Sequence, residues 1–524
     1  MKKLKWSLIA SVIAVSGMSA QTLSDAIKQT RNEQFESAEA IYKKLIQNKE
    51  GNLGDLYFYY GENFFKNDNL QMAAEMYQAG ADVNATNPLP YVGLGKIQWY
   101  QGKQTEAKAN FYKATTLGGG KNATVLMKIA ETYINADKKN LPEAFTLLAT
   151  ATKLEPKNPE VYLLTGDAYL EQNDGSKAIE NYEKAGSLDA KSVLAILRQG
   201  QLYNRAKNYT LALDLYKKAS LVDSSFAPAY REKAEIFFRA GQYNNAVAQY
   251  KRYLQLNDNC GARGRYAGFL FKAKQYAPSI EASKEAKKCD PNNVYLDRYL
   301  AYDYYETNDF TNGLASSQAF FAKASPDKIL PLDYEYRGKL NAKAGNDSLA
   351  VLDYKKALEM DTSRTELNNE MANSYMKMKK YNEAIALLKS KVSSGKAGIN
   401  DYYSIGRAYY YSKDFVSADS SFSKIIALQP ELSLGYLWRA KANVQLDPEN
   451  KQWKSKEFYE TFISKVKPEE TERSKKDLID AYNYLAAYHA SKKDCAGTKV
   501  WILKIVELDP NNAQAKKVLA GLKC

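Results

Sequence analysis

One feature constrains the fold of this chain more than any other: a small residue returns about every 34 positions within an apolar-periodic stretch. Most of these residues, called anchors below, are 33 to 35 residues apart; two steps are 36 and 37, and the last is 46. Self-similarity at such a period is typical of repeat arrays and argues against one globular core. The anchors are Ala26, Gly61, Gly95, Ala130, Gly166, Gly200, Ala234, Ala267, Ala301, Gly338, Ala372, Gly406, Ala440 and Ala486.

Each anchor is followed by companions at fixed distances. An aromatic residue often stands three positions later, a small residue twelve later and a large residue sixteen later, as in Tyr169, Ala178 and Tyr182 after Gly166. Two antiparallel helices approach closely only where both carry small side chains, and aromatic rings one turn away fill the remaining space. Prolines such as Pro291 then fall where the second helix must end. The pattern predicts a helical hairpin per repeat.

These residues resemble the tetratricopeptide repeat family. One clear copy comprises Tyr162, Gly166, Tyr169, Ala178, Tyr182 and Ala185; another comprises Tyr402, Gly406, Tyr409, Ala418, Phe422 and Pro430. The resemblance extends over thirteen to fourteen copies, with departures around Ser279/Ser283, Gly313/Ser317 and Asn443. It implies an all-α fold, a right-handed α-solenoid of helix-turn-helix repeats whose first helices line a concave surface.

The expected organisation follows from the repeats. We expect a signal peptide over 1–20, an array of about nine repeats over 21–325, a continued array over 326–446, lengthened last repeats over 447–511 and a capping helix over 512–524. The regular repeat spacing is interrupted at three places, near 118–120, 325–332 and 447–476. We expect bends or joints there and not domain boundaries.

The first twenty residues have the features of a secretory signal. Lys2, Lys3 and Lys5 precede a mostly apolar stretch, Trp6–Met18, that is too short to span a bilayer, and Ser19-Ala20 offers a cleavage site. An uncleaved anchor is the alternative. Loss of three lysines would take the formal charge from +14 to +11. We expect the chain to be exported to the periplasm and the mature chain to contain no transmembrane segment. An optional peripheral association with the outer membrane would be made through a partner.

The chain has four cysteines, and three pairings are open on sequence alone. The hairpin arrangement favours Cys260–Cys289, at the two ends of one hairpin, and Cys495–Cys524, between the last hairpin and the capping helix. Each bridge would close a loop of about 30 residues and contribute roughly 3 kcal/mol. Four reduced thiols are the alternative.

Signals for catalysis are weak. His489 is the sole histidine, which excludes a two-histidine zinc site, and it occupies the aromatic position three after an anchor. Gly264 and Gly268 lack both the preceding strand and the Gly-Lys-Ser/Thr ending of a phosphate-binding loop. We therefore expect no enzyme activity, no catalytic residues, no cofactor and no metal site.

The concave surface is the better candidate site. In the family's geometry, positions one, four and five after each anchor face it, and these are rich in aromatic and basic residues. The expected partner-binding residues are Phe65, Trp99, Tyr100, Arg205, Phe238, Arg239, Phe271, Tyr302, Tyr305, Arg407, Tyr410 and Tyr411. Such a surface suits an extended peptide that is part apolar and part acidic. The alternative is structural, because Lys and Arg also favour the last turn of a helix. The family's paired Lys/Asn grip on a C-terminal carboxylate is not reproduced near Asn369 and Asn373.

An export signal joined to repeats favours a periplasmic protein-binding scaffold, as a subunit of or accessory to an outer-membrane assembly, secretion or motility complex. The partners would be envelope proteins or extended peptide segments, and not nucleic acid. One alternative is a binder of anionic envelope polymer, lipopolysaccharide or peptidoglycan, driven by the positive charge. Another is a chaperone-like carrier of unfolded envelope proteins.

Overall fold

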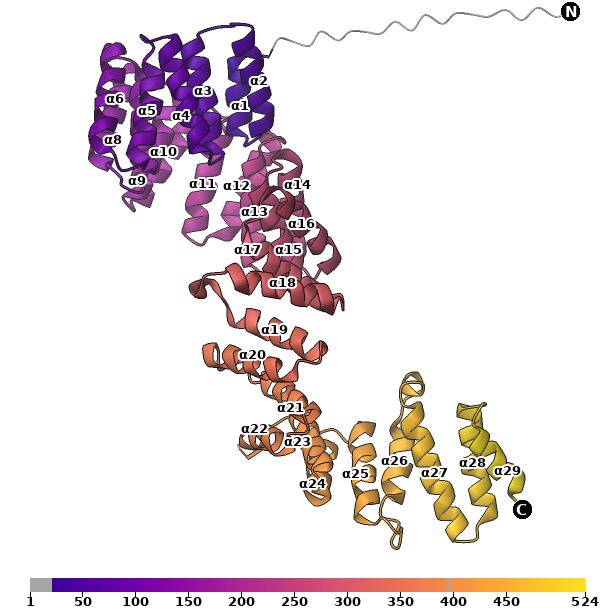
Figure 1. Ribbon diagram of the computed structural model, residues 1–524. Coiled ribbons are helices and arrows are strands. Elements are labelled where there is room, and N and C mark those ends of the chain that lie inside the picture. Colours follow the sequence, from indigo (N-terminus) through magenta and orange to yellow (C-terminus); the bar gives the residue numbers. More distant parts are fainter. Residues whose placement is uncertain (1–20, 394, 396) are drawn as a thin grey trace, which may run out of the picture. The chain divides into compact units, whose positions relative to one another are not determined.

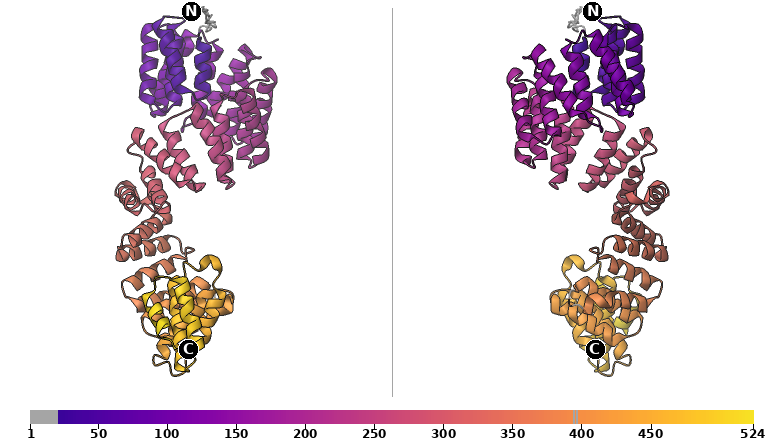
Figure 2. Two further views of the ribbon diagram at one scale, coloured as in Figure 1. Left: turned by 90° about the vertical axis from the view of Figure 1, so that its right-hand side faces the viewer. Right: turned by 90° about the vertical axis from the view of Figure 1, so that its left-hand side faces the viewer.

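The computed structural model describes residues 21–393, 395 and 397–524, so the expected signal peptide lies outside the described residues. Within them the regular structure consists of 29 α-helices and two short 3-10 helices, with no strand. Consecutive α-helices pack as antiparallel pairs (Figures 1 and 2). This arrangement confirms the α-solenoid. The chain divides into two compact units, which meet in sequence at Pro291 and Asn292.

The first unit contains eight helical pairs. Their bounds are α1 (Leu23–Arg31), α2 (Phe35–Gln47), α3 (Leu53–Lys66), α4 (Leu70–Val83), α5 (Pro88–Tyr100), α6 (Gln104–Leu117), α7 (Ala123–Asn135), α8 (Leu141–Leu154), α9 (Pro159–Glu171), α10 (Gly175–Leu188), α11 (Val193–Arg205), α12 (Tyr209–Val222), α13 (Ala227–Arg239), α14 (Tyr243–Leu256), α15 (Cys260–Lys272) and α16 (Tyr276–Cys289).

The second unit contains six pairs and a final single helix. Their bounds are α17 (Val294–Glu306), α18 (Phe310–Lys323), α19 (Pro331–Lys343), α20 (Asp347–Met360), α21 (Leu367–Lys377), α22 (Tyr381–Ser393), α23 (Ile399–Tyr411), α24 (Phe415–Leu428), α25 (Ser433–Leu446), α26 (Lys456–Lys465), α27 (Lys475–Ser491), α28 (Cys495–Leu508) and α29 (Ala513–Gly521). The 3-10 helices η1 (Pro326–Lys328) and η2 (Pro468–Glu470) lie at two of the expected joints.

The core of each pair is the set of anchor and companion residues. The small residues twelve after the anchor, such as Ala178 and Ala212, are fully buried, as are the rings of Tyr182 and Tyr216 sixteen after it. A Cβ atom on Gly166 would lie 2.4 Å from the ring of Tyr182. The glycine therefore lets a second-helix ring lie directly against the first-helix backbone.

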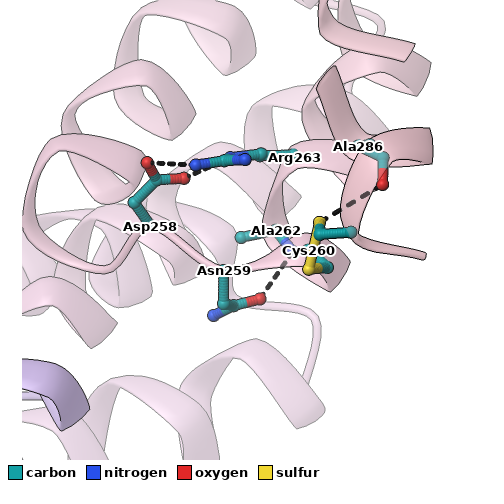
Figure 3. Close-up of a disulfide and its surroundings, with 7 residues drawn as sticks. Asp258, Asn259, Cys260, Ala262, Arg263 and Ala286 are labelled. Carbon is teal, nitrogen blue, oxygen red and sulfur yellow. Dashed lines mark hydrogen bonds and ion pairs between the residues drawn. A yellow bond between two sulfur atoms is a disulfide. The ribbon is translucent and has the colours of Figure 1, made fainter. Parts of the chain in front are cut away.

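Both expected cysteine pairs come together. Cys260 begins α15 and Cys289 ends α16, with their Cα atoms 5.9 Å apart (Figure 3). Cys495 begins α28 and pairs with Cys524, which follows α29, at a Cα–Cα distance of 5.6 Å. Both separations suit a disulfide. The first bridge thus joins the two helices of the last hairpin of the first unit. The second joins the start of α28, in the last hairpin of the second unit, to the segment that follows α29.

Among the residues that the structure describes, no helix is both long and apolar enough to cross a membrane.

Candidate functional site

A groove in the second unit gathers side chains from several successive repeats. It has a volume of about 480 Å³ and draws residues from α17 and from α19 through α23. Its lining consists of Tyr305, Lys339, Ala342, Lys343, Tyr354, Glu370, Asn373, Ser374, Met376, Lys377, Tyr381, Arg407 and Tyr411. We call it the concave groove.

Four cations line the concave groove against a single carboxylate, Glu370. Two of the cations have partners. The Lys339 ammonium lies 2.6 Å from Glu335; burial opposes its charge, but the hydrogen bond and charge of Glu335 outweigh burial and raise the pKa of Lys339. Lys377 lies 3.5 Å from Asp347 and donates to the Ala342 carbonyl at 3.1 Å.

The other two cations, Lys343 and Arg407, have no carboxylate within ion-pair distance among the described residues. The Lys343 ammonium lies 5.2 Å from the ring centre of Phe310. The Arg407 guanidinium lies 5.4 Å from the ring of Tyr403 and 5.9 Å from that of Tyr411. Aromatic faces stabilise a cation only modestly at exposed sites. Both groups can therefore still bind an anion.

Aromatic rings form the remainder of the concave groove. Tyr381 and Tyr411 stack with their ring centres 6.2 Å apart, and Tyr411 is 44% exposed. Tyr354 contributes to the groove wall but is fully buried; its hydroxyl has no hydrogen-bond partner among the described residues, and burial raises the pKa of this phenol well above its ordinary value. Tyr354 therefore stays protonated.

Three of the residues expected from the sequence line this groove together: Tyr305, Arg407 and Tyr411. Two others, Tyr302 and Tyr410, are not part of its lining. The Tyr302 side chain is buried and its hydroxyl donates to Asp333 at 2.5 Å. Tyr410 packs edge-on against Trp438 at 5.5 Å.

The expected aromatic residues of the first unit are largely packed against one another. Trp99 is buried beside Tyr133, and its indole nitrogen donates to the Lys138 carbonyl at 2.9 Å. Phe65 meets Tyr100 edge-on at 5.1 Å. Phe238 stacks on Phe269 at 4.7 Å, and Phe271 is buried. Their role in binding a partner stays a prediction.

The expected arginines of the first unit bond to the preceding repeat. Arg205 donates to Asn173 at 2.7 Å and to the Leu170 carbonyl at 3.4 Å, and Arg239 donates to Asn204 at 3.2 Å. These contacts satisfy groups at the end of the previous first helix. Both guanidinium groups also stay exposed.

Sequence reasoning missed Lys339, Tyr354, Asn373 and Tyr381 as groove residues. A signal existed for two of them, because Lys339 and Asn373 stand one position after the anchors Gly338 and Ala372. No such signal marks Tyr354 and Tyr381, which belong to second helices.

A second cavity lies inside the first unit. It has a volume of about 240 Å³ and is lined from α1, α2, α3, α7, α9 and α11, among other segments. We call it the hollow. Ion pairs join neighbouring first helices near it: Lys96 of α5 to Glu62 of α3 at 2.7 Å, and Lys128 of α7 to Glu160 of α9 at 2.8 Å. Lys128 also pairs with Glu131 within α7 at 3.0 Å.

Comparison with known proteins identifies repeats of the same kind. A family model described as tetratricopeptide repeat matches residues 136–192, 163–228 and 197–259. The C-terminal part of a TPR repeat-containing protein from Cytophaga hutchinsonii is 34% identical, and the match covers 50% of this chain and all of that one, with a TM-score of 0.44. The chain belongs to the tetratricopeptide repeat family.

Two further solved structures share less of their sequence with this chain. A tetratricopeptide repeat protein from Parabacteroides merdae is 21% identical over 48% of this chain and 98% of its own, with a TM-score of 0.32. Yeast Tom70 is 15% identical over 75% of this chain and 95% of its own, with a TM-score of 0.29. No curated protein matches the sequence. Tetratricopeptide repeat proteins bind peptides or proteins and act as interaction scaffolds.

Proposed function

We propose that this tetratricopeptide repeat protein is an exported, non-enzymatic adaptor of the cell envelope that holds an extended, acidic segment of a partner protein in the concave groove. The observation that carries the proposal is a pair of cations, Lys343 and Arg407, that have no carboxylate partner in the described part of the chain and lie in a groove with Tyr381 and Tyr411. A segment with carboxylates and an apolar or aromatic side chain is complementary to both features.

The groove is tested by the double variant Lys343→Ala/Arg407→Ala. We expect capture of partner proteins from envelope extracts to fall strongly, because binding loses both anion contacts. The matched control is Lys355→Ala/Lys424→Ala, which removes two exposed lysines of the same unit on the second helices α20 and α24. Equal capture by the groove variant and the wild type would refute the concave groove as the partner-binding site.

Export is a separate part of the proposal. It is supported by the lysine-led apolar segment at the N-terminus, the small residues at Ser19-Ala20 and two cysteine pairs at disulfide distance. N-terminal sequencing of the protein from fractionated cells should find Gln21 as the first residue, in the periplasm or the outer-membrane fraction. An intact Met1 in the cytosol would contradict export.

Anionic envelope polymer is the second candidate ligand. The excess of Lys and Arg over Asp and Glu, 74 against 60, favours it. Binding driven by overall charge would fall steeply with salt and would weaken equally in the groove variant and the lysine control. Loss in the groove variant alone favours the protein partner.

A further inference from the structure

Two cations of the hollow, Arg31 and Lys66, have no carboxylate within ion-pair distance in the described part of the chain. They line the hollow from the last turns of the neighbouring first helices α1 and α3. Each stands five residues after its anchor, so the two occupy equivalent positions. A hydrogen bond of 2.8 Å from the Thr30 hydroxyl to Asn63 joins the same two turns. The hollow therefore presents two positive charges from adjacent helices.

Arg31 also carries a donor that lacks an acceptor. Its side chain is half-buried, and its Nε atom is buried with no hydrogen-bond partner among the described residues. A charged donor that is buried without a partner is costly. An acceptor supplied by a ligand would remove that cost.

Lys66 lacks the partner that its place in the repeat would give it. At the equivalent position of a later repeat, Arg205 donates to Asn173, which stands seven after the preceding anchor. The corresponding residue for Lys66 is Glu33, whose two carboxylate oxygens accept from Arg231 at 2.5 and 2.6 Å. Water reaches Lys66, but the surrounding protein solvates its charge incompletely, and this lowers the pKa of Lys66. A bound carboxylate would stabilise the charge.

The other charges near these cations do not favour a simple anion. Lys128 pairs with both Glu131 and Glu160, and Lys96 pairs with Glu62. Two ammonium groups thus face three carboxylates in this network. A ligand that carried only negative charge would be repelled by the excess carboxylate.

Asp189 adds a further carboxylate to the hollow. It follows α10, is exposed, and its side chain accepts the backbone N–H of Lys191 at 3.0 Å. No lysine or arginine of the described residues forms an ion pair with it. Counted with the ion-pair network, four cations and four carboxylates belong to the hollow, so their charges cancel. A ligand that has both a carboxylate and an ammonium group is complementary to this distribution.

The size and apolar lining of the hollow limit this ligand further. Ile27 of α1 and Leu194 of α11 are half-buried in the lining and offer contact to an apolar side chain. The volume of about 240 Å³ lies below the usual range for drug-sized ligands. A single amino acid carries both of its charges on one carbon, whereas the free cations and Asp189 belong to different helical pairs. A dipeptide places its charges further apart, by about 3.5 Å.

We propose that the hollow binds a dipeptide with both ends free and an apolar side chain, whose carboxylate lies against Arg31 and Lys66 and whose ammonium group lies against Asp189. This site belongs to the first unit and the concave groove to the second. The proposed function can therefore fail while the dipeptide site holds, and the reverse.

The first test uses the unaltered full chain and a set of matched ligands. Calorimetric titration with leucylalanine should show saturable binding. The N-acetylated dipeptide lacks the ammonium charge and the C-amidated dipeptide lacks the carboxylate, so each should bind about tenfold more weakly. Free leucine should also bind more weakly, because its two charges are too close together. Absence of saturation by leucylalanine would overturn the proposal, and so would equally tight binding of either blocked dipeptide or of leucine.

The second test assigns each charge of the ligand to a residue. Arg31→Gln and Lys66→Gln should each weaken leucylalanine about tenfold and leave the amidated dipeptide unaffected, because that ligand has no carboxylate to lose. Asp189→Asn should weaken leucylalanine and leave the N-acetylated dipeptide unaffected. The matched controls are Lys44→Gln on α2 and Glu183→Gln on α10, which remove exposed charges outside the lining and should change nothing.

Far-UV circular dichroism establishes that each of these variants is folded. Equal losses for leucylalanine and for the blocked dipeptides would show that a substitution acts through the fold and not through the matched charge. Losses of the same size in the two controls would likewise contradict the assignment.

The third test locates the ligand without any substitution. In methyl spectra of the full chain, saturation with leucylalanine should shift the resonances of Ile27 and Leu194. The exposed Leu503 of α28 in the second unit should keep its position. Saturable binding that leaves Ile27 and Leu194 unshifted would place the dipeptide elsewhere and refute the hollow as its site.

Discussion

At the scale of single residues, buried polar contacts join one repeat to the next. Glu62 of α3 and Lys96 of α5 form an ion pair in which the side chains are 6% and 4% exposed. Glu62 also accepts a hydrogen bond from Tyr77 at 2.6 Å. A buried charge without its partner is costly, whereas a matched apolar pair in its place can be nearly neutral.

Lys96→Met should therefore destabilise the first unit by about 3–5 kcal/mol, because it leaves the Glu62 carboxylate buried and unpaired. Glu62→Gln/Lys96→Met should recover most of that loss. Urea unfolding gives the free energy, and amide hydrogen exchange in α3 and α5 locates the change. A cost for the single variant below about 1 kcal/mol, as for an exposed ion pair, would contradict this account.

At the scale of elements, one turn geometry is used almost throughout. The residue seven after the anchor has a positive φ in most hairpins, as at Asn173 (63°), Lys207 (61°) and Gly241 (72°). This left-handed residue ends the first helix and lets the chain reverse tightly. The hairpins of α7 and α25 lack it at Asp137 and Asp447, where the connecting loops differ. Many of these positions carry Lys or Asn and not Gly, so composition alone does not mark them.

The final helix depends on a covalent tie. The nine residues of α29 are too few to be helical by themselves, and only one of them, Ala515, is buried. Cys495→Ser/Cys524→Ser should therefore speed amide exchange in α29 and lower stability by roughly 3 kcal/mol at most. Cys260→Ser/Cys289→Ser is the matched control, since it should leave α29 protected. A non-reduced digest that yields neither linked peptide would show that the pairs are not oxidised.

The sequence suffices for the hairpins and the cysteine pairs because both follow from local spacing. Gly166, Ala178 and Tyr182 meet within one hairpin, and so do Cys260 and Cys289. The concave groove is different: Tyr305 and Arg407 converge from α17 and α23. Such convergence depends on small rotations between successive repeats, which accumulate along the array and leave no periodic mark. The contacts of Asn32 with Asp223 and of Glu33 with Arg231 join even more distant segments and could not be foreseen for the same reason.

At the scale of the whole chain, each unit has its own core. The apolar clusters of residues before Pro291 lie wholly in the first unit, and those after Asn292 lie wholly in the second. In a repeat array, stability is close to a sum of repeats and nearest-neighbour contacts, so a long section retains its fold when the array is cut. The expected joint near 325–332 lies within the second unit, and its status as a joint stays a prediction.

Residues 21–291 and 292–524, expressed separately, should therefore each fold with the helix content that they have in the full chain, with fraying confined to the new ends.

The two fragments should differ in function. The second carries the concave groove and should retain capture of an acidic partner, and this capture should still be lost in Lys343→Ala/Arg407→Ala. The first carries the hollow and not the concave groove, and it should not capture that partner. Circular dichroism and capture from envelope extracts check both statements. Loss of partner binding by a well-folded second fragment would mean that the groove alone does not supply the affinity.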